Sequence, residues 1–302
     1  MKLVFIINNK QDRLRKRLPE LLYHFDNKYS GQVEFLYTQG TKHAIELAKK
    51  SAEMGCDYLI AVGGDGTLHE VVNGVMQSGV GDENYPIIGL LPWGSANDFA
   101  RTAGLTPSVE SLARSIDSHS IRRIDVGQIL SSRVPEARYF INVAGIGLGP
   151  EVVLQMERSE PKLGPALHYF GSIVKGFLKY RKKRVICSAG SWRYEGRLLQ
   201  LAVGNGRYLG HGICITPDAL LDDGKFELAI FGDLSLWDYL RKLGKLKKGI
   251  KIDHPEVQYH SADSLRMESP DSCGIEADGE YVGLLPANIK VLPGALRFLF
   301  PA

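Results

Sequence analysis

Residues 58–74 read Tyr58-Leu-Ile-Ala-Val-Gly-Gly-Asp-Gly-Thr-Leu-His-Glu-Val-Val-Asn-Gly74, and this stretch decides the fold of the N-terminal part of the chain. An apolar run typical of a β-strand ends in glycines, and an amphipathic helix pattern starts directly after them. Glycines at a strand-to-helix turn let backbone N–H groups approach an anion closely, and the helix N-terminus adds a partial positive charge. The stretch therefore predicts a phosphate-binding loop.

Asp65 is the unusual residue of the turn Gly63-Gly64-Asp65-Gly66-Thr67. A carboxylate beside a phosphate repels it unless a metal ion lies between the two groups. A loop that combines phosphate-binding glycines with one carboxylate is therefore typical of a site for a nucleotide with Mg²⁺. For these residues alone, an ordinary glycine-rich turn that starts a helix remains the alternative.

The first third of the sequence alternates between strand patterns and helix patterns. This alternation predicts a Rossmann-like α/β nucleotide-binding domain with a mainly parallel sheet, whose ligands bind at the carboxyl ends of the strands. The expected strands cover 3–7, 33–37, 58–62 and 87–91, and the expected helices cover 12–26, 41–54, 67–78 and 108–117.

A second polar motif follows the strand expected at 87–91. It reads Pro92-Trp93-Gly94-Ser95-Ala96-Asn97-Asp98-Phe99-Ala100-Arg101 and supplies glycine, hydroxyl and carboxylate groups. The carboxyl ends of neighbouring parallel strands lie at one edge of the sheet. We therefore expect this loop and the glycine turn after Tyr58–Val62 to converge on one nucleotide.

The pattern changes at Ile124-Asp125-Val126-Gly127, after which short β-type runs separated by Gly, Pro and Asp dominate. These runs predict a C-terminal antiparallel β-sandwich domain, interrupted by helices at 164–180 and 235–248. The predicted domains are thus 1–124 and 125–302. The expected strands of the second domain cover 124–130, 138–144, 184–188, 198–203, 226–231, 264–268, 273–277, 288–292 and 295–300.

Composition sets mild bounds on the class of protein. The chain has 302 residues, of which 44% are hydrophobic and 24% charged, as in globular proteins, and its net charge of +3 is too small to argue for nucleic acid. Its 4 cysteines are far apart and predict reduced thiols. Because we see no signal-peptide layout and no apolar run long enough to span a membrane, we expect a cytoplasmic protein.

The motifs together resemble the diacylglycerol kinase catalytic domain family, which includes bacterial soluble diacylglycerol kinases and the sphingosine and ceramide kinases. The glycine-aspartate loop by itself is shared with NAD kinases and phosphofructokinases, but the ordered set is far more specific. The family fold, an α/β nucleotide domain followed by a β-sandwich, agrees with the organisation predicted above. Besides the two loops, the resemblance rests on Tyr139–Gly145, Gly204-Asn205-Gly206, Pro217–Gly224 and Asp278-Gly279-Glu280.

The resemblance implies that Asp65, Asp98 and Glu280 organise a catalytic Mg²⁺, partly through water, and that Glu280 accepts the proton of the attacking hydroxyl. These roles suit phosphoryl transfer, because a primary alcohol is a poor nucleophile until a carboxylate takes its proton. Asp278-Gly279 is also the signature of a type I′ hairpin, which can present one rigid carboxylate. The implied nucleotide contacts are Asn8, Thr38, Gly63, Gly64, Asp65, Gly66, Thr67, Leu68, His69, Glu70, Ser95 and Asn97, and the nucleotide is ATP.

The resemblance also implies a second, structural Mg²⁺, bound by the Asp223 side chain and by the backbone carbonyls of Leu220 and Lys225. Oxygen ligands suit this hard cation, which retains part of its water. A solvated turn at 222–224 is the alternative. Such an ion would stabilise the second domain and take no part in the chemistry.

One loop departs from the family pattern. Members usually have Asn-Pro-x-Ser-Gly after the first strand, whereas this chain has Asn8-Asn9-Lys10-Gln11-Asp12, with neither proline nor glycine. The departure puts nucleotide affinity in doubt. Ser95 replaces the common Thr of the second loop and keeps the hydroxyl.

Two basic clusters beside apolar helix patterns predict peripheral contact with an anionic membrane surface. Two solvated helix faces are the alternative, and the sequence does not decide between the clusters. A homodimer also stays open. The first cluster comprises Lys175, Lys179, Arg181, Lys182, Lys183 and Arg184, and the second comprises Arg241, Lys242, Lys245, Lys247, Lys248 and Lys251.

The sequence thus favours an ATP- and Mg²⁺-dependent kinase that phosphorylates a membrane lipid, with diacylglycerol as the expected acceptor. Another lipid, such as a sphingoid base or phosphatidylglycerol, is an alternative acceptor. A soluble kinase of the NAD kinase type shares the glycine-aspartate loop but lacks Gly94–Phe99 and Asp278–Glu280 in this form. A lipid-binding protein without catalysis is the third reading, motivated by the altered first loop.

Overall fold

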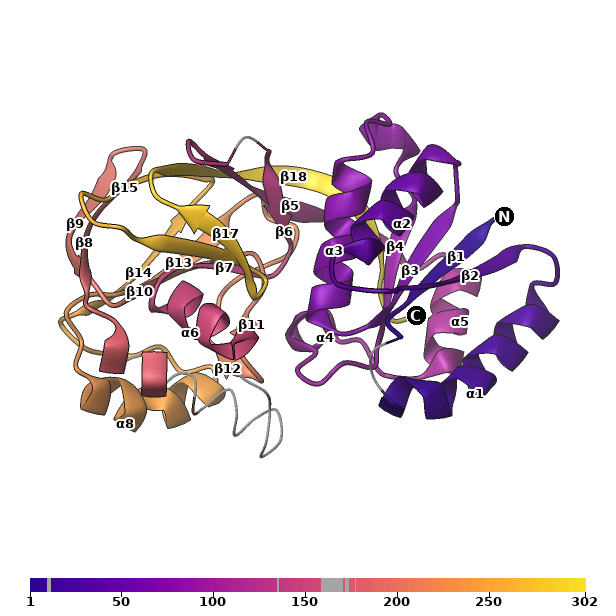
Figure 1. Ribbon diagram of the computed structural model, residues 1–302, viewed down its shortest axis with the longest axis horizontal. Coiled ribbons are helices and arrows are strands. Elements are labelled where there is room, and N and C mark those ends of the chain that lie inside the picture. The colour runs from indigo at the N-terminus through magenta and orange to yellow at the C-terminus, as the bar shows by residue number, and fades with distance from the viewer. Residues whose placement is uncertain (10–11, 135, 159–170, 172–173, 177) are drawn as a thin grey trace. The chain divides into compact units, whose positions relative to one another are not determined.

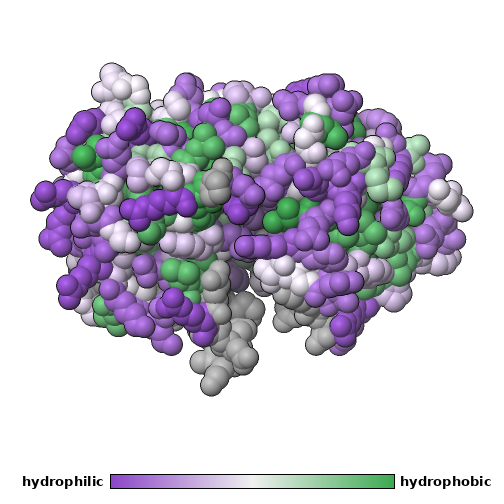
Figure 2. Space-filling model, turned by 45° about the horizontal axis from the view of Figure 1, so that its top comes forward, coloured by the Kyte–Doolittle hydropathy of each residue, from purple (hydrophilic) through white to green (hydrophobic). Residues whose placement is uncertain are grey.

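The computed structural model describes residues 1–302 except 10–11, 135, 159–170, 172–173 and 177 (Figure 1). The chain forms two compact units. The first comprises Met1–Ile124 together with Gly294–Ala302, and the second comprises Asp125–Pro293. Within the described residues, no helix is both long and apolar enough to cross a membrane. On the face shown in Figure 2, hydrophilic residues predominate and apolar residues form small groups.

The first unit is built on a parallel sheet in the order β2-β1-β3-β4, followed by β18. Phe5 pairs with Phe35 on one side and with Ile60 on the other, in parallel register. The central strands have no exposed residue, which explains their continuous apolar runs. The strands are β1 Leu3–Ile7, β2 Val33–Tyr37, β3 Tyr58–Gly63, β4 Ile87–Pro92 and β18 Ala287–Leu299.

Helices cover both faces of this sheet (Figure 1). Leu21 and Phe25 of α1 and Ile116 of α5 pack against the strands from one side. The pair α2 and α3 contacts the sheet as well. The six-residue α4 was not predicted, because so short a helix shows no apolar period. The helices are α1 Asp12–Lys28, α2 His43–Glu53, α3 Asp65–Met76, the 3₁₀ turn Asp82–Asn84, α4 Asp98–Ala103 and α5 Val109–Asp117.

The second unit contains a six-stranded antiparallel sheet in the order β14-β13-β10-β7-β16-β17. Its apolar face, with Ile146 and Leu201, packs in one core with Val185, Met267 and Ile289 of the other strands of the unit, as in a sandwich. The six strands are β7 Val143–Gly147, β10 Gln200–Gly204, β13 Phe226–Phe231, β14 Val257–Ala262, β16 Gly274–Ala277 and β17 Glu280–Leu284.

Strands β15, β8 and β9 continue from β18 to form the opposing layer of the second unit. On the outer side of the six-stranded sheet, α6 and α8 cover a second apolar cluster (Figure 1). The remaining elements are β5 Ile121–Ser131, β6 Arg138–Phe140, α6 Leu148–Glu157, β8 Lys183–Ala189, β9 Trp192–Leu198, β11 Tyr208–Leu209, β12 Ile213–Cys214, α8 Leu236–Lys247 and β15 Ser264–Glu268.

The structure confirms the fold class, an α/β unit with an antiparallel β-sandwich, but it differs from the expected organisation near the end of the chain. The strands expected at 288–292 and 295–300 form the single strand β18. Its last part belongs to the first unit, whereas the predicted second domain extended to 302. The reason is parallel pairing of Phe298 with Ile88 and packing of the Phe298 ring 5.1 Å from the Phe99 ring, between centroids.

Two further expectations concern the second unit. The strand expected at 138–144 divides into β6 and β7, because the backbone at 141–143 turns to bind the Asp278 carboxylate. Most of the helix expected at 164–180 lies outside the described residues. The helix expected at 235–248 corresponds to α8.

Candidate active site

The glycine turn after β3 has the geometry of an anion-binding loop. Gly64 is extended (φ −112°, ψ −164°), and α3 begins at Asp65. The Leu68 N–H donates to the Gly64 carbonyl at 3.1 Å, so the N–H groups of the preceding three residues have no acceptor within the helix. A Cβ added to Gly66 would meet no atom within 4 Å. The turn therefore presents backbone donors beside open space, which suits a phosphate.

The second polar loop packs directly against this turn. A Cβ added to Gly94 would lie 2.2 Å from the Gly64 Cα, and one added to Gly64 would lie 3.0 Å from the Gly94 Cα. Real Cβ atoms do not approach backbone as closely as 2.2 Å, so position 94 needs glycine, and at position 64 a side chain would be very tight. The two loops converge as the sequence predicted, and the exposed Ser95 follows Gly94 at this edge of the sheet.

Asn97 shapes the second loop. It adopts the left-handed conformation (φ 53°), and its side-chain oxygen accepts the Gly94 N–H at 3.0 Å. Its side-chain nitrogen donates to the carbonyls of Pro92 and Gly94 at 3.1 and 3.0 Å. The side chain is thus engaged within the turn, and its contribution to nucleotide binding would be to hold the loop against Gly64.

Asp65 and Asp98 are both positioned by the N-terminus of α4, which begins at Asp98. The Asp65 Oδ1 accepts the Phe99 N–H at 2.9 Å, so this carboxylate also caps the N-terminus of α4. Asp65 Oδ2 forms no hydrogen bond with any residue that the structure describes. Asp98 is 3% exposed and lies 3.7 Å from the Arg101 Nε. Asp65 is therefore the more accessible of the two candidate metal ligands.

The fit of Mg²⁺ to this site can be tested on its donors. In the described part of the chain, no group of three or more His, Cys, Asp and Glu side chains could hold a metal. A Mg²⁺ ion here would combine one or two carboxylates with phosphate and water oxygens, which is how this cation usually binds beside a nucleotide. Asp65 and Asp98 fit that arrangement, and they would hold the ion only together with the phosphates.

The predicted contacts Asn8, Thr38 and Thr67 take part in two hydrogen bonds at the ends of the first strands. Asn8 donates from its side chain to the Thr67 hydroxyl at 3.2 Å. The Asn9 N–H donates to the Thr38 hydroxyl at 3.3 Å, and Thr38 follows β2. The carboxyl ends of β1, β2 and β3 are therefore connected to the start of α3. The adjacent residues 10–11 of the altered first loop lie outside the described residues.

The side chains of the later α3 residues serve other contacts. Both Glu70 carboxylate oxygens accept backbone N–H groups at the start of α2, from Lys42 at 2.9 Å and Ala44 at 3.0 Å. His69 is buried with its Nε2 3.3 Å from the Asn73 side-chain nitrogen, and Leu68 is part of the core. Nucleotide contacts predicted at 68–70 would thus require the backbone, whereas these side chains position the helix.

Glu280 lies in the second unit, directly after a tight hairpin between β16 and β17. Asp278 (φ 51°) and Gly279 (φ 86°) both have positive φ, as a type I′ turn requires. Glu280 is half-buried and pairs with Ala277 across the hairpin. The hairpin thus fixes the backbone from which this carboxylate projects.

The hairpin tip is held by two other carboxyl groups, Glu276, which the sequence analysis missed, and Asp278, which it placed in the turn without foreseeing its backbone contacts. Asp278 accepts three backbone N–H groups, from Ile141 at 3.1 Å and from Asn142 and Val143 at 3.0 Å. Glu276 is buried, and its Oε2 accepts the Gly279 N–H at 2.9 Å. Burial, together with the charges of Asp278 and Glu280, raises the pKa of Glu276 to about 8. A charged residue within the apolar strand Gly274–Ala277 is the signal that could have revealed Glu276.

The turn predicted to hold a structural metal is organised by a different carboxylate. Asp223 is exposed and accepts the Lys225 N–H at 3.1 Å, which is an Asx turn. The buried Asp125 accepts the Gly224 N–H at 2.7 Å and donates its own N–H to the Leu221 carbonyl at 2.7 Å. A cation at Leu220, Asp223 and Lys225 would have a single carboxylate ligand, so carbonyls and water would have to complete its shell.

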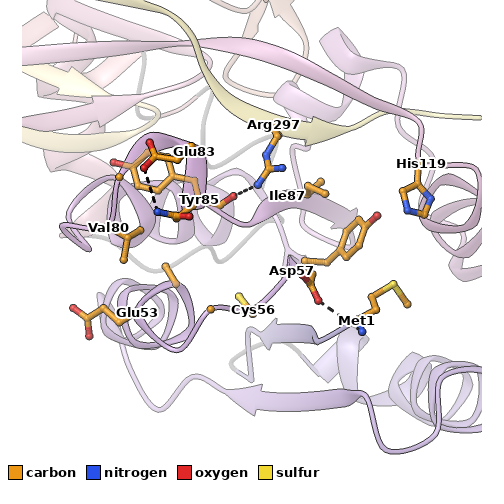
Figure 3. Close-up of a pocket in the computed structure, with 15 residues that line it drawn as sticks. Met1, Glu53, Cys56, Asp57, Val80, Glu83, Tyr85, Ile87, His119 and Arg297 are labelled. Carbon is orange, nitrogen blue, oxygen red and sulfur yellow. Dashed lines mark hydrogen bonds and ion pairs between the residues drawn. The ribbon is translucent and has the colours of Figure 1, made fainter.

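A surface pocket of about 850 Å³ in the first unit lies at the opposite ends of the strands (Figure 3). It is lined by Tyr58 and Ile87, where β3 and β4 begin. Within it the Met1 amino group lies 3.8 Å from Asp57, and Arg297 donates to the Tyr85 carbonyl. Ligands of parallel α/β sheets bind at the carboxyl ends of the strands, so this pocket is not the candidate active site.

Comparisons with known proteins agree with this geometry. Residues 2–129 match the model of the diacylglycerol kinase catalytic domain, and residues 145–300 match that of the YegS C-terminal NAD kinase beta sandwich-like domain. Diacylglycerol kinase of Staphylococcus carnosus is 30% identical over 305 residues, covering 99% of this chain and 94% of the relative. Diacylglycerol kinase of Bacillus subtilis is 26% identical over 302 residues, covering 99% and 96%.

Solved structures share the fold of the whole chain. A crystal structure from Bacillus anthracis superposes with a TM-score of 0.80 at 24% identity, covering 99% of this chain and 96% of that one. A diacylglycerol kinase from the same organism gives a TM-score of 0.74 at 20% identity, with coverages of 99% and 96%. The full-length match to a relative at 30% identity and the two successive domain matches show that this chain belongs to the diacylglycerol kinase family.

Proposed function

We propose that this protein is an ATP- and Mg²⁺-dependent lipid kinase that phosphorylates diacylglycerol to phosphatidate. The observation that carries the proposal is the contact between the glycine turn and the second loop, which places Asp65 beside backbone donors and open space. The names of the full-length relatives, diacylglycerol kinases, support the choice of acceptor. The protein would work in the cytoplasm and touch the membrane transiently.

In this proposal the nucleotide phosphates lie against the backbone N–H groups at Gly64–Thr67, with Ser95 as a further donor. Asp65 and Asp98 would hold Mg²⁺, which neutralises charge on the phosphates during transfer. Asn97, Glu70 and Asp278 act as positioning residues, because their side chains are engaged with backbone groups.

The chemical step requires an activated hydroxyl. The Glu280 carboxylate would accept the proton of the lipid hydroxyl as its oxygen forms a bond to the γ-phosphorus of ATP. The bond from that phosphorus to the bridging oxygen breaks, and ADP leaves with the bonding electron pair. The products are ADP, the phosphorylated lipid and one proton, which Glu280 then releases to solvent.

The experiment that tests the proposal is a radiolabel transfer assay with purified protein, γ-labelled ATP and Mg²⁺. Separate reactions contain diacylglycerol, phosphatidylglycerol, a sphingoid base or NAD as the acceptor. We expect label mainly in phosphatidate, and none with the Asp65→Asn variant. Preferential labelling of another lipid would overturn the acceptor, and labelling of NAD or of nothing would overturn the lipid kinase assignment.

A further inference from the structure

The helix α8 has one face packed into the second unit and one face exposed. Tyr239 and Leu246 are 3% and 0% exposed, and Leu243 packs in the same cluster. The Tyr239 ring lies 6.0 Å from the Phe231 ring, between centroids, in an edge-on arrangement. These contacts fix which side of the helix is turned outward (Figure 1).

The exposed face combines an aromatic side chain with basic ones. Trp237 is 71% exposed, although indole is usually largely buried in folded proteins. Arg241, Lys245 and Lys248 follow it at spacings of four, four and three residues, which places all four on one side of the helix. The neighbouring Lys247 is exposed as well.

The four basic residues of this face form no ion pair with any residue in the described part of the chain. Other lysines nearby differ. Lys251 pairs with Asp218 and Glu227, and Lys242 donates to the Asp253 carbonyl. The positive charge of Arg241, Lys245, Lys247 and Lys248 is therefore available to a partner outside the chain.

Gly244 lies on the same exposed face, in the interior of the helix. A Cβ there would meet no atom within 4 Å, so neither packing nor backbone conformation requires glycine. Glycine at such a position destabilises a helix relative to alanine. Just after the helix, Ile250 is 49% exposed. The face thus carries an exposed indole and a flat position among four cations, with the exposed Ile250 just beyond the end of the helix.

We propose that this face, Trp237, Arg241, Gly244, Lys245, Lys247, Lys248 and Ile250, is the surface by which the protein docks on an anionic lipid bilayer. The inference rests on the proposed lipid kinase function. Cations near an anionic surface gain electrostatic attraction, and tryptophan prefers the boundary between headgroups and acyl chains. In the basic cluster at 175–184, by contrast, Lys182 is paired with Asp233.

The test is partitioning of full-length protein onto sedimentable vesicles of phosphatidylcholine with or without phosphatidylglycerol, in the absence of ATP. The triple variant Arg241→Gln/Lys245→Gln/Lys248→Gln should partition about 100-fold more weakly onto the anionic vesicles, since each basic residue contributes a factor of about 5. The loss should shrink at about 1 M salt, where charges are screened within about 3 Å. Trp237→Ala should weaken partitioning at both salt concentrations.

The matched control is Lys49→Gln/Lys50→Gln/Lys290→Gln, which removes the same charge from exposed positions on other elements. The control should partition within about twofold of the parent, because attraction to an anionic membrane falls off within a Debye length of its surface. Equal losses in control and test variants would overturn the α8 surface, since net charge alone would then explain binding. Tighter binding of an RNA oligonucleotide than of anionic vesicles, lost in the test variant, would overturn it in favour of nucleic acid.

Activity separates this inference from the proposed function. Turnover of a short-chain, water-soluble diacylglycerol should be unchanged in the α8 variants, because the nucleotide site is not altered. If the parent phosphorylates no lipid but its vesicle binding is lost in the α8 variants, the proposed function fails and the surface stands. If it phosphorylates soluble diacylglycerol but all variants bind vesicles alike, the surface fails and the function stands.

Discussion

The dipeptide Asp-Gly lies in a candidate site loop of each unit, at 65–66 and at 278–279, and the two loops use it in opposite ways. In the first unit, Asp65-Gly66 starts a helix whose first backbone donors lie beside open space. In the second unit, Asp278-Gly279 forms a hairpin tip, and the Asp278 carboxylate itself binds three backbone donors at 141–143. In the proposed function the first loop binds an anion from outside, whereas the second loop already contains an anion supplied by the chain.

This difference explains why similar residues serve binding in one place and rigidity in the other. Backbone N–H groups gathered at a loop need an acceptor, and an external phosphate can supply it only where no side chain does so first. Substitutions at Asp65 should therefore affect turnover with little change in stability, whereas those around Asp278 should affect stability and turnover together.

The largest effect is expected for Asp65→Asn. The amide oxygen can still accept the Phe99 N–H, but the side chain loses the charge that would hold Mg²⁺. We expect kcat to fall by at least about 10⁴-fold, or about 5.5 kcal/mol, with an unchanged unfolding temperature. If the variant keeps more than about a tenth of the parent rate, a loss of under about 1.4 kcal/mol, the Asp65 charge is not required for turnover and the contrast between the two loops fails.

Stability should depend on pH through Glu276, whose pKa is raised from 4.5 to about 8 in the folded protein. Below the ordinary value the carboxyl is protonated in both folded and unfolded chains, so the full stability is present. As pH rises to about 8, only the unfolded chain ionises, and the free energy of unfolding should fall by up to roughly 5 kcal/mol at about 1.4 kcal/mol per pKa unit.

Glu276→Gln removes this titration, while its side-chain oxygen can still accept the Gly279 N–H. Urea unfolding at pH values from 5 to 9 should show a flatter profile for the variant than for the parent. Parallel profiles would show that Glu276 does not carry the pH dependence.

Glu280→Gln should lower kcat by about 10² to 10⁴, the usual contribution of a general base, and leave ATP affinity nearly unchanged. The alternative is that Glu280 only holds Mg²⁺ through water. In that case the variant would need more Mg²⁺, and saturating metal would restore most of the rate. Recovery above about half of the parent kcat in a Mg²⁺ titration would exclude the general-base role, since such recovery is incompatible with a loss of that size.

A smaller effect, now on stability, is expected for Asp278→Asn. The substitution replaces a carboxylate that accepts three N–H groups by an amide with only one accepting atom. The free energy of unfolding should fall by about 1.5 to 3 kcal/mol. The control is Asp223→Asn, at an exposed carboxylate with a single backbone N–H, where the change should stay within about 0.5 kcal/mol. If the free energy of unfolding changes equally in the two variants, the Asp278 carboxylate stabilises the fold no more than an exposed carboxylate does.

Much of the first unit could be predicted from sequence, because its signals are local. Strands buried on both faces give continuous apolar runs, and the glycine turn after Val62 marks a strand-to-helix junction directly. The strands β9, β14 and β17 were missed, since none of them has more than one fully buried residue and each is recognisable mainly by its antiparallel partner. Such pairings join residues far apart in the chain, and no local pattern records them.

The candidate site was predictable in its loops but not in the engagement of its side chains. The residue types at 63–67 and 94–98 indicate phosphate and metal chemistry by themselves. The residue type of Asn97 does not reveal that its side chain is bound within its own turn. The contact of Glu70 with the start of α2 joins residues 26 positions apart in the chain. Asp125 was missed for the same reason, because its partner Gly224 is 99 residues away.

The long strand β18 has a consequence for how the chain is made. Residues 294–302 complete the first unit, yet the ribosome synthesises them only after the whole of the second unit. Until they emerge, Ile88 lacks its parallel partner and Phe99 lacks the Phe298 ring. The first unit therefore cannot be completed before the last residues are made although its sequence comes first, and a fragment of residues 1–124 should be digested by protease faster than the same residues in the full chain.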